Sequence, residues 1–367
     1  MILYLSLTHN CQLRCDYCYA GEKLHKPMSK ETILKSIEFT LQLPMKKLEF
    51  GFFGGEPLME WELFQFATHE MERQAKKKGI ALTKSFTTNG VLLDSNKVNW
   101  LREHGFYVVV SLDGNELMHN THRVYVNGEK TFWAVQKGLK ELQKRYKEGE
   151  YAVISVVTPK NIQHLPDSVA YLHQELGVKH INLALDYFTE WKEETTAYRD
   201  IYHQVGAYAL EQYRQGKQLN IDIIDDKIRT ATESNCQGCG FGELKLAVAP
   251  SGRLYPCERL IGNDTGALSM GNVHTGFDHS QRSKMIEERG NSNEECQTCP
   301  IKERCTNSCG CTNYTLTNSI NTTNGTVCFF QKLFIEVADK VASTLYEEKN
   351  EMFMGKFYSS HPSKTSP

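Results

Sequence analysis

Cysteine is the residue type whose positions say most about the chemistry of this chain. Cys11, Cys15 and Cys18 form one group, and the other nine of the 12 cysteines lie between Cys236 and Cys328. Cysteines that only filled a core would be scattered, whereas thiolates gathered in two short segments are typical of ligands for soft metals. We interpret both groups as metal ligands, because a reducing cytosol does not preserve disulfides.

The first group places three thiolates within eight residues, in the run CQLRCDYC. A closed zinc site takes four ligands, and an iron–sulfur cubane with a purely structural role also takes four cysteines. Three ligands therefore indicate a cluster with one iron left open to a substrate or cofactor. A zinc site completed by His9 or His25 is the structural alternative.

The elements that must position these cysteines are short apolar runs that alternate with amphipathic stretches of helical length. The predicted strands are 2–7, 47–52, 82–87, 107–112, 151–157 and 180–185. The predicted helices are 30–43, 61–77, 95–104, 132–146, 165–176 and 195–215. Ser29 is placed to cap the first helix, and Gly105 and Gly177 to end two others.

Six consecutive strand–helix units predict an α/β fold with a parallel sheet. An open doubly wound sheet and a partial (β/α)6 TIM-type barrel both satisfy this order, and we favour the partial barrel. In either fold, ligands bind at the carboxyl ends of the strands. The first cysteine group follows the first strand directly and so lies at that end.

Beyond residue 215 the pattern changes to a region rich in Cys and Gly. We expect a barrel over residues 1–215, a connector over 216–235, a Cys-rich extension over 236–345 and a disordered tail over 346–367. Residues 243–249 and 253–257, joined by the turn Pro250-Ser251-Gly252, are predicted to form a hairpin. A helix is predicted over 329–347.

The CxxxCxxC spacing, with Tyr17 before the last cysteine, resembles the signature of the radical S-adenosylmethionine (SAM) enzymes. The resemblance implies that Cys11, Cys15 and Cys18 bind a [4Fe–4S] cluster whose open iron chelates SAM. It also implies that one-electron cleavage of SAM yields a 5′-deoxyadenosyl radical, which abstracts a hydrogen atom from the substrate.

Further matches to that family follow at the ends of later strands. Gly54-Gly55-Glu56-Pro57 resembles the GGEP motif that binds the SAM amino group, and glycine lets backbone approach a ligand while Glu56 can accept from an ammonium. An ordinary strand-to-helix turn is the alternative. The resemblance also implies SAM-facing roles for four polar or turn residues and one apolar residue: Asn89, Ser111, Asp113, Arg123 and Leu185.

The second cysteine group resembles the SPASM extension, which carries two auxiliary [4Fe–4S] clusters in peptide-modifying radical SAM enzymes. That resemblance implies one cluster on Cys236, Cys257 and Cys309, either with Cys239 as the fourth ligand or with an iron left open to a substrate thiol. It implies a second cluster on Cys296, Cys299, Cys305 and Cys328. A pair of zinc ribbons is the alternative. Cys311 is left over, either as a hydrogen-atom donor or as an inert thiol.

Glu258 is the candidate catalytic residue outside the cysteines. Sulfatase maturases of this superfamily have an Asp directly after the hairpin cysteine, thought to deprotonate the substrate. A carboxylate suits a general base, although Glu places its oxygens one methylene further out. A solvated surface Glu is the alternative.

The resemblance implies a cytoplasmic peptide maturase that oxidises a ribosomally made precursor peptide or protein to a thioether or carbon–carbon cross-link. The alternatives are an anaerobic sulfatase maturase, which forms formylglycine, and a zinc-stabilised binding protein without catalysis. Expected partners are a flavodoxin or ferredoxin as electron donor and a separate leader-binding protein, since only ten residues precede the first cysteine.

Charge and hydropathy exclude two other classes of partner. A formal net charge of −2 gives no electrostatic footprint for nucleic acid. No apolar run is long enough to span a membrane, and residues 1–8 lack the features of a secretory signal.

Overall fold

The computed structural model describes residues 1–191, 195–232, 240–290, 293–305 and 309–358. In these ranges a sheet has the strand order β7-β6-β5-β4-β3-β2-β1-β8-β9. The strands are β1 (Ile2–Ser6), β2 (Lys47–Phe53), β3 (Ala81–Thr88), β4 (Phe106–Ser111), β5 (Tyr151–Val157), β6 (His180–Leu185), β7 (Asn220–Ile221), β8 (Lys245–Val248) and β9 (Leu254–Tyr255). A short antiparallel pair, β10 (Gly271–Asn272) and β11 (Gly276–Phe277), forms a second sheet against the β8–β9 hairpin.

The α-helices alternate with the strands as far as β7 and then follow one another towards the C-terminus. They are α1 (Lys30–Leu41), α2 (Trp61–Lys78), α3 (Ser95–Glu103), α4 (Glu116–Asn120), α5 (Phe132–Gln143), α6 (Leu165–Ala170), α7 (Thr195–Arg214), α8 (Asp222–Thr232), α9 (His279–Gly290), α10 (Glu294–Gln297), α11 (Gly310–Thr317), α12 (Gly325–Glu347) and α13 (Glu351–Phe357). A π-helical turn, η3 (Tyr171–Glu175), continues α6.

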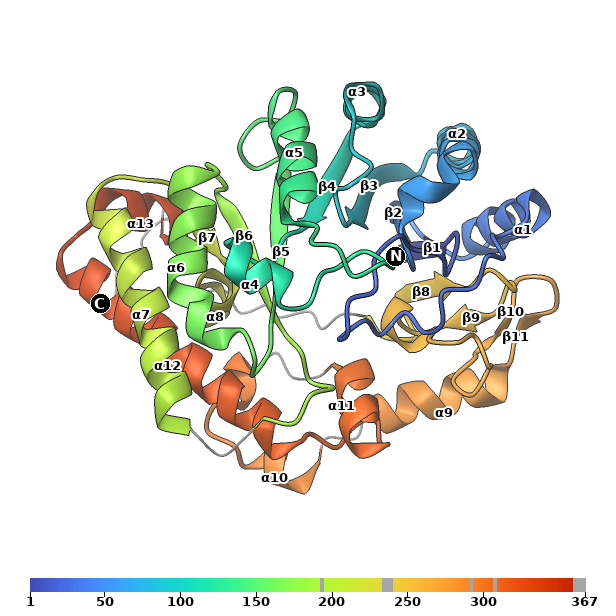
Figure 1. Ribbon diagram of the computed structural model, residues 1–367. Helices are drawn as coiled ribbons and strands as arrows, with labels where there is room; N and C mark the ends of the chain where they lie inside the picture. The colour runs from blue at the N-terminus through green and yellow to red at the C-terminus, as the bar shows by residue number, and fades with distance from the viewer. Residues whose placement is uncertain (192–194, 233–239, 291–292, 306–308, 359–367) are drawn as a thin grey trace.

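The predicted α/β fold is confirmed. Strands β1 to β6 pair in sequence order and all in parallel. Figure 1 shows a curved sheet with α1, α2, α3, α5 and α6 around its outer side and the carboxy-terminal helices along the opposite side. The side chains of Phe52, Phe64 and Phe86 are almost completely buried between the sheet and the outer helices, which is why apolar runs in the sequence located the strands.

The residues that were predicted to begin or end helices do so in the structure. The Ser29 side chain accepts a hydrogen bond from the Thr32 amide at 3.0 Å and so caps α1. Gly105 and Gly177 have φ values of 63° and 66° directly after helical segments, a conformation that glycine adopts without steric cost. These signals involve only neighbouring residues, which makes them legible in the sequence.

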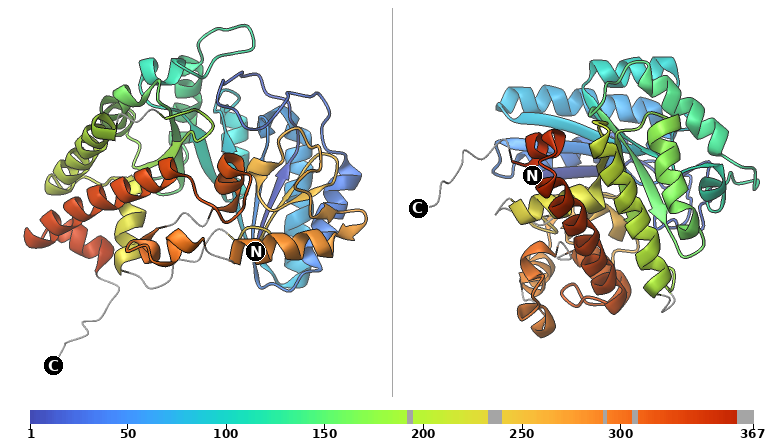
Figure 2. Two further views of the ribbon diagram at one scale, coloured as in Figure 1. Left: turned by 90° about the horizontal axis from the view of Figure 1, so that it is seen from below. Right: turned by 90° about the vertical axis from the view of Figure 1, so that its left-hand side faces the viewer.

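The predicted hairpin is present, and it continues the sheet of the barrel. Strand β8 pairs in parallel with β1, and β9 pairs antiparallel with β8. Helix α12 then packs against α7 and α8, as the two views of Figure 2 show. The hairpin therefore joins the segment that carries Cys257, which follows β9, to the sheet next to β1, the strand that precedes the first cysteine group.

The predicted connector contains regular elements, and the predicted disorder of the tail is wrong for residues 351–357. The connector predicted over 216–235 contains β7, which pairs with β6, and α8, whose apolar face is buried. The tail predicted as disordered from 346 contains α13, because Phe353 and Phe357 are buried and Asn350 caps the helix. Both departures depend on long-range contacts. No helix among the described ranges is both long and apolar enough to cross a bilayer.

Candidate active site at the carboxyl ends of the strands

The first cysteine group lines a cavity of about 360 Å³ at the carboxyl ends of the parallel strands. Cys11, Cys15 and Cys18 all lie on the loop that follows β1 and all contribute to its wall. Burial raises the pKa of Cys11, and it raises the pKa of Cys15 to about 12. These thiols are therefore protonated near neutral pH, and metal binding must release their protons.

The cysteine loop is held by a segment that follows α4. The Arg14 amide donates to the Val124 carbonyl at 2.8 Å, and the Val126 amide donates to the Gln12 carbonyl at 3.1 Å. Because main-chain hydrogen bonds join the two segments, the loop has a defined shape before any ligand binds.

Most of the residues predicted to bind SAM lie on the cavity wall. Those that line it are Tyr17, Gly54, Gly55, Asn89, Ser111, Arg123 and Leu185. The candidate base Glu258 lines it as well. Glu56, Pro57 and Asp113 do not form part of this wall; each is buried in the protein next to it.

The two glycines at positions 54 and 55 allow the turn after β2 to pack against the cysteine loop. A Cβ on Gly54, whose φ is +114°, would lie 2.3 Å from the Ser6 hydroxyl oxygen. A Cβ on Gly55 would lie 2.0 Å from the Asn10 carbonyl oxygen. The Gly55 amide donates to the Thr8 carbonyl at 2.9 Å. Any side chain at either position would push the turn away from the loop.

Glu56 is buried and acts on neighbouring protein groups. Its carboxylate accepts from the Asn89 amide at 2.7 Å, the Thr88 hydroxyl at 2.8 Å and the Leu58 amide at 3.0 Å. Burial raises the pKa of Glu56 to about 7 despite these donors. In this arrangement Glu56 fixes Asn89, whose side-chain amide lies 3.6 Å from the Cys11 sulfur.

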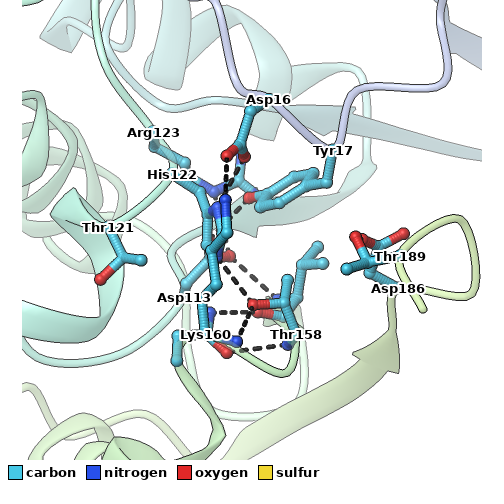
Figure 3. Close-up of polar contacts among 12 residues, drawn as sticks. Asp16, Tyr17, Asp113, Thr121, His122, Arg123, Thr158, Lys160, Asp186 and Thr189 are labelled. Atoms are coloured by element: carbon cyan, nitrogen blue, oxygen red, sulfur yellow. Dashed lines mark hydrogen bonds and ion pairs between the residues drawn. The ribbon is translucent and has the colours of Figure 1, made fainter. Parts of the chain in front are cut away.

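Asp113 connects the cysteine loop to the guanidinium in the cavity wall (Figure 3). Its carboxylate accepts from the Tyr17 hydroxyl at 2.6 Å and from the Val156 amide at 2.9 Å. It also forms an ion pair with Arg123 at 3.0 Å, in which both side chains are buried. Asp113 thus acts through Tyr17 and Arg123, which do line the cavity.

The sequence analysis did not predict a second side-chain contact between the cysteine loop and the segment that follows α4. His122 lies 2.6 Å from the Asp16 carboxylate through Nδ1 and 2.7 Å from the Thr158 hydroxyl through Nε2 (Figure 3). Asp16 lies between Cys15 and Cys18 in the sequence. Its position inside the cysteine motif is the signal from which a contact at this residue could have been predicted.

The hairpin of the extension supplies another part of the cavity wall. The short helix η4 (Glu258–Leu260) places both Glu258 and Arg259 there. Glu258 accepts from the Lys245 ammonium at 2.8 and 3.0 Å. Burial alone would lower the pKa of Lys245, but the Glu258 carboxylate raises it above the usual value. Glu258 is therefore a positioned, charge-paired carboxylate at the cavity.

Four cysteines of the second group line a separate cavity of about 240 Å³. They come from three different segments of the chain and were predicted to share one cluster: Cys296, Cys299, Cys305 and Cys328. A set of four thiols around one cavity matches the ligand set of a four-iron cluster.

The other cysteines of the extension are only partly described. Cys257, Cys309 and Cys311 lie together: the Cys309 and Cys311 sulfurs are 3.1 Å apart, and the Cys311 thiol also contacts that of Cys257. Cys311 therefore lies next to two predicted ligands but is not on the wall of the SAM cavity. Cys236 and Cys239 lie outside the described residues.

The donor sets fit iron–sulfur clusters better than single ions. Among the described residues, no three Cys, His, Asp or Glu side chains are grouped so as to hold one metal ion. A four-iron cluster binds each thiolate at a different iron, so its ligands surround a volume instead of converging on a point. Cys11, Cys15 and Cys18 would hold the cluster with the open iron, and the four thiols of the second cavity a closed one.

We expect the double substitution of Cys305 and Cys328 by alanine to remove about four irons from a total of about twelve per chain. SAM cleavage should persist, because these thiols line a different cavity from Cys11. Iron and sulfide analysis of anaerobically reconstituted protein measures this. Cys311→Ala is the matched control and should keep about twelve irons. An unchanged iron content in the double variant would contradict the assignment.

Comparison with protein families gives one match, which covers the barrel from β1 to α6. Residues 5–172 match the model of the Radical SAM superfamily.

Several curated relatives match most of the chain, including one from Clostridium and one from Klebsiella. The cysteine-type anaerobic sulfatase-maturating enzyme of Clostridium perfringens (strain 13 / Type A) is 23% identical over 340 residues, spanning 84% of this chain and 88% of the relative. The serine-type enzyme of Klebsiella aerogenes is 24% identical over 320 residues, spanning 82% of this chain and 76% of the relative.

Solved structures share the fold at low sequence identity. The structure of native anSMEcpe with bound AdoMet superposes with a TM-score of 0.81 at 22% identity, covering 95% of this chain and 99% of that chain. Streptococcus suis SuiB bound to its precursor peptide SuiA gives a TM-score of 0.62 at 15% identity, covering 89% and 75%. Both agree with a partial barrel that continues into a carboxy-terminal extension.

Proposed function

The chain carries a radical SAM domain over residues 5–172 and is a radical SAM enzyme, and on that premise we propose that it oxidises one side chain of a peptide or protein. The expected SAM and SAM-binding [4Fe–4S] cluster follow from membership of that superfamily. The observation that carries the proposal is the shared cavity, in which three cysteines of the barrel face a carboxylate of the extension. The auxiliary clusters are part of the proposal.

When bound, the cluster and SAM supply a 5′-deoxyadenosyl radical that removes a hydrogen atom from the substrate. The chain's own residues bind and orient the reactants. Gly54 and Gly55 let the main chain approach the ligand closely. Arg123, oriented by Asp113, offers a guanidinium for a carboxylate. The walls contributed by the barrel and the hairpin limit access of water to the reacting atoms.

We propose formylglycine formation in a sulfatase as the reaction. Loss of one hydrogen atom, one proton and one electron converts a Ser side chain to an aldehyde, or a Cys side chain to a thioaldehyde that water hydrolyses. Glu258 is placed to take the proton, and an auxiliary iron–sulfur cluster would take the electron. The two sulfatase-maturating relatives described above, which match more than four fifths of this chain, support this reaction over the cross-linking that we expected first.

The proposed partners are a sulfatase-type substrate and a flavodoxin or ferredoxin as reductant. A separate leader-binding protein belongs to the cross-linking alternative, because ribosomally made precursors are often presented by such a protein. An assay that uses dithionite as the reductant and a synthetic peptide as the substrate needs neither the flavodoxin or ferredoxin nor the leader-binding protein.

The test uses reconstituted enzyme with SAM, dithionite and peptides that carry a central Ser or Cys. We expect 5′-deoxyadenosine together with a peptide aldehyde, which a hydrazide probe traps. Glu258→Gln should lower aldehyde formation by about 10²–10⁴-fold, the usual contribution of a positioned base, while 5′-deoxyadenosine still forms. A peptide that loses hydrogen without gaining an aldehyde would support cross-linking instead. No peptide product from any substrate would contradict the proposal.

A further inference from the structure

Arg259 lies in the wall of the active-site cavity, and the proposed reaction does not use its positive charge. It follows the candidate base Glu258 in η4, and both residues line the cavity. Its guanidinium lies 5.3 Å from the centre of the Tyr19 ring, which belongs to the cysteine loop of the barrel. Arg259 therefore reaches from the extension towards the barrel.

The other cations at this site are already paired with carboxylates. Arg123 forms its ion pair with Asp113 at 3.0 Å, and Lys245 pairs with Glu258 at 2.8 Å. Within the part of the chain that the structure describes, Arg259 has no hydrogen bond or ion pair to any Asp or Glu. Its guanidinium lies against the Tyr19 ring and within electrostatic range of the Cys257, Cys309 and Cys311 thiols, and no carboxylate of the described residues engages its N–H donors.

The Arg259 side chain is partly buried in the cavity wall. Partial removal of a charge from water is unfavourable unless a partner compensates for it. The planar fork of arginine matches the two oxygens of a carboxylate, and such bidentate pairs are among the strongest polar contacts in proteins. Arg259 can therefore bind the carboxylate of a molecule that enters the cavity.

We propose that Arg259 binds a carboxylate of the peptide or protein substrate, close to the side chain that is oxidised. This inference rests on the proposed function. The adjacent Glu258 must contact the substrate if it is the base, so residue 259 lies at the substrate end of the cavity. The substrate carboxylate is an Asp or Glu side chain or a chain terminus.

The carboxylate of SAM is the other source of the same chemistry. Arg123 and Ser111 project from the barrel into the cavity beside the cysteine loop, where SAM must sit to reach an open iron. Arg259 comes from the extension, next to Glu258. We therefore assign the SAM carboxylate to the barrel and the substrate carboxylate to Arg259.

A second role for Arg259 would be electrostatic compensation of cysteine thiolates. Cys257, Cys309 and Cys311 are close enough to Arg259 to raise its pKa, although burial opposes this. If that were its whole role, substitution would alter the auxiliary cluster without affecting the choice of peptide. The experiment separates the two roles.

The experiment measures binding without turnover, using the full reconstituted enzyme with SAM and no reductant. The probes are fluorescently labelled synthetic peptides with a central Ser, in pairs that carry Asp or Asn at each flanking position in turn. Fluorescence anisotropy gives the affinity of each peptide. At one position the Asp peptide should bind about 10–150-fold more tightly than its Asn partner, since a hydrogen bond to a charged group contributes about 1.5–3 kcal/mol.

Arg259→Met should abolish that preference, and Arg259→Lys should retain part of it, because lysine keeps the charge but not the fork. Arg253→Met is the matched control: this residue of the same hairpin pairs with Asp264 at 3.4 Å and is not on the cavity wall. It should keep the full preference. Iron content and the electron paramagnetic resonance spectrum of each variant show whether the clusters are intact.

Three results would overturn the inference: no Asp preference at any position in the wild-type enzyme, a preference that survives in Arg259→Met, or a loss in that variant of SAM affinity alone. A change confined to the cluster spectrum would assign Arg259 to the thiolates and also overturn it. Failure of the proposed reaction is seen separately, as peptides that bind with the Asp preference but yield no product.

Discussion

Replacing Cys11, Cys15 and Cys18 together by alanine is expected to abolish 5′-deoxyadenosine formation and to remove about four irons per chain. These thiols line one cavity on a loop held to its neighbour by main-chain hydrogen bonds, so the barrel should persist without them. Enzymes exceed uncatalysed rates by on the order of 10⁶-fold or more, and loss of the cluster should return SAM cleavage to the uncatalysed level.

Two measurements check this result: liquid chromatography of 5′-deoxyadenosine after addition of SAM and dithionite, and iron and sulfide content per chain. The control replaces Cys311 alone, since it lies away from the SAM cavity, and it should cleave SAM normally. Continued SAM cleavage by the triple variant would refute the assignment of the first cysteine group. Zinc in place of iron in the wild-type protein would favour the non-catalytic alternative.

Asp113→Ala is expected to lower the free energy of unfolding by about 3–5 kcal/mol, the cost of breaking a buried ion pair by removing one partner. The Asp113 side chain has no solvent exposure, and its loss leaves the Arg123 charge, the Tyr17 hydroxyl and the Val156 amide without their acceptor. Domains are typically stable by only about 5–15 kcal/mol, so the effect is large.

Urea denaturation of wild-type and variant protein measures that difference, and Asp113→Asn should lose less because it retains an acceptor oxygen. A suitable control is Glu38→Ala, which removes a surface pair with Lys35 in which both side chains are about half exposed. Surface pairs of this kind contribute about 0–1 kcal/mol. Equal losses for Asp113→Ala and Glu38→Ala would show that the buried network does not stabilise the fold.

The position of Asp113 also affects how the SAM site should be understood. The family resemblance implied that Asp113 faces SAM, whereas the structure places Asp113 behind Tyr17 and Arg123. Glu56 likewise faces Asn89 and Thr88 instead of the cavity. Substitution at either position should therefore disturb the shape of the cavity wall as well as the affinity for SAM.

The sequence by itself determined the features that depend on neighbouring residues. Strand β5, the cap at Ser29 and the β8–β9 hairpin all follow from apolar periodicity, helix capping or turn chemistry within a few positions. The three-cysteine spacing of the first group is equally local, and together with its position after the first predicted strand it indicated the radical SAM domain.

Tertiary structure alone decided which polar groups meet. Tyr17 and Asp113 are 96 positions apart, and Asp16 and His122 are 106 apart. Nor does any local pattern show that β8 joins β1, or that Arg259 enters the cavity beside Glu258. A buried charge is stable only where folding supplies a partner, and that partner comes from whichever distant segment the sheet and helices bring alongside. Arg123 therefore has a carboxylate partner and Arg259 has none among the described residues, although both are arginines in the same cavity wall.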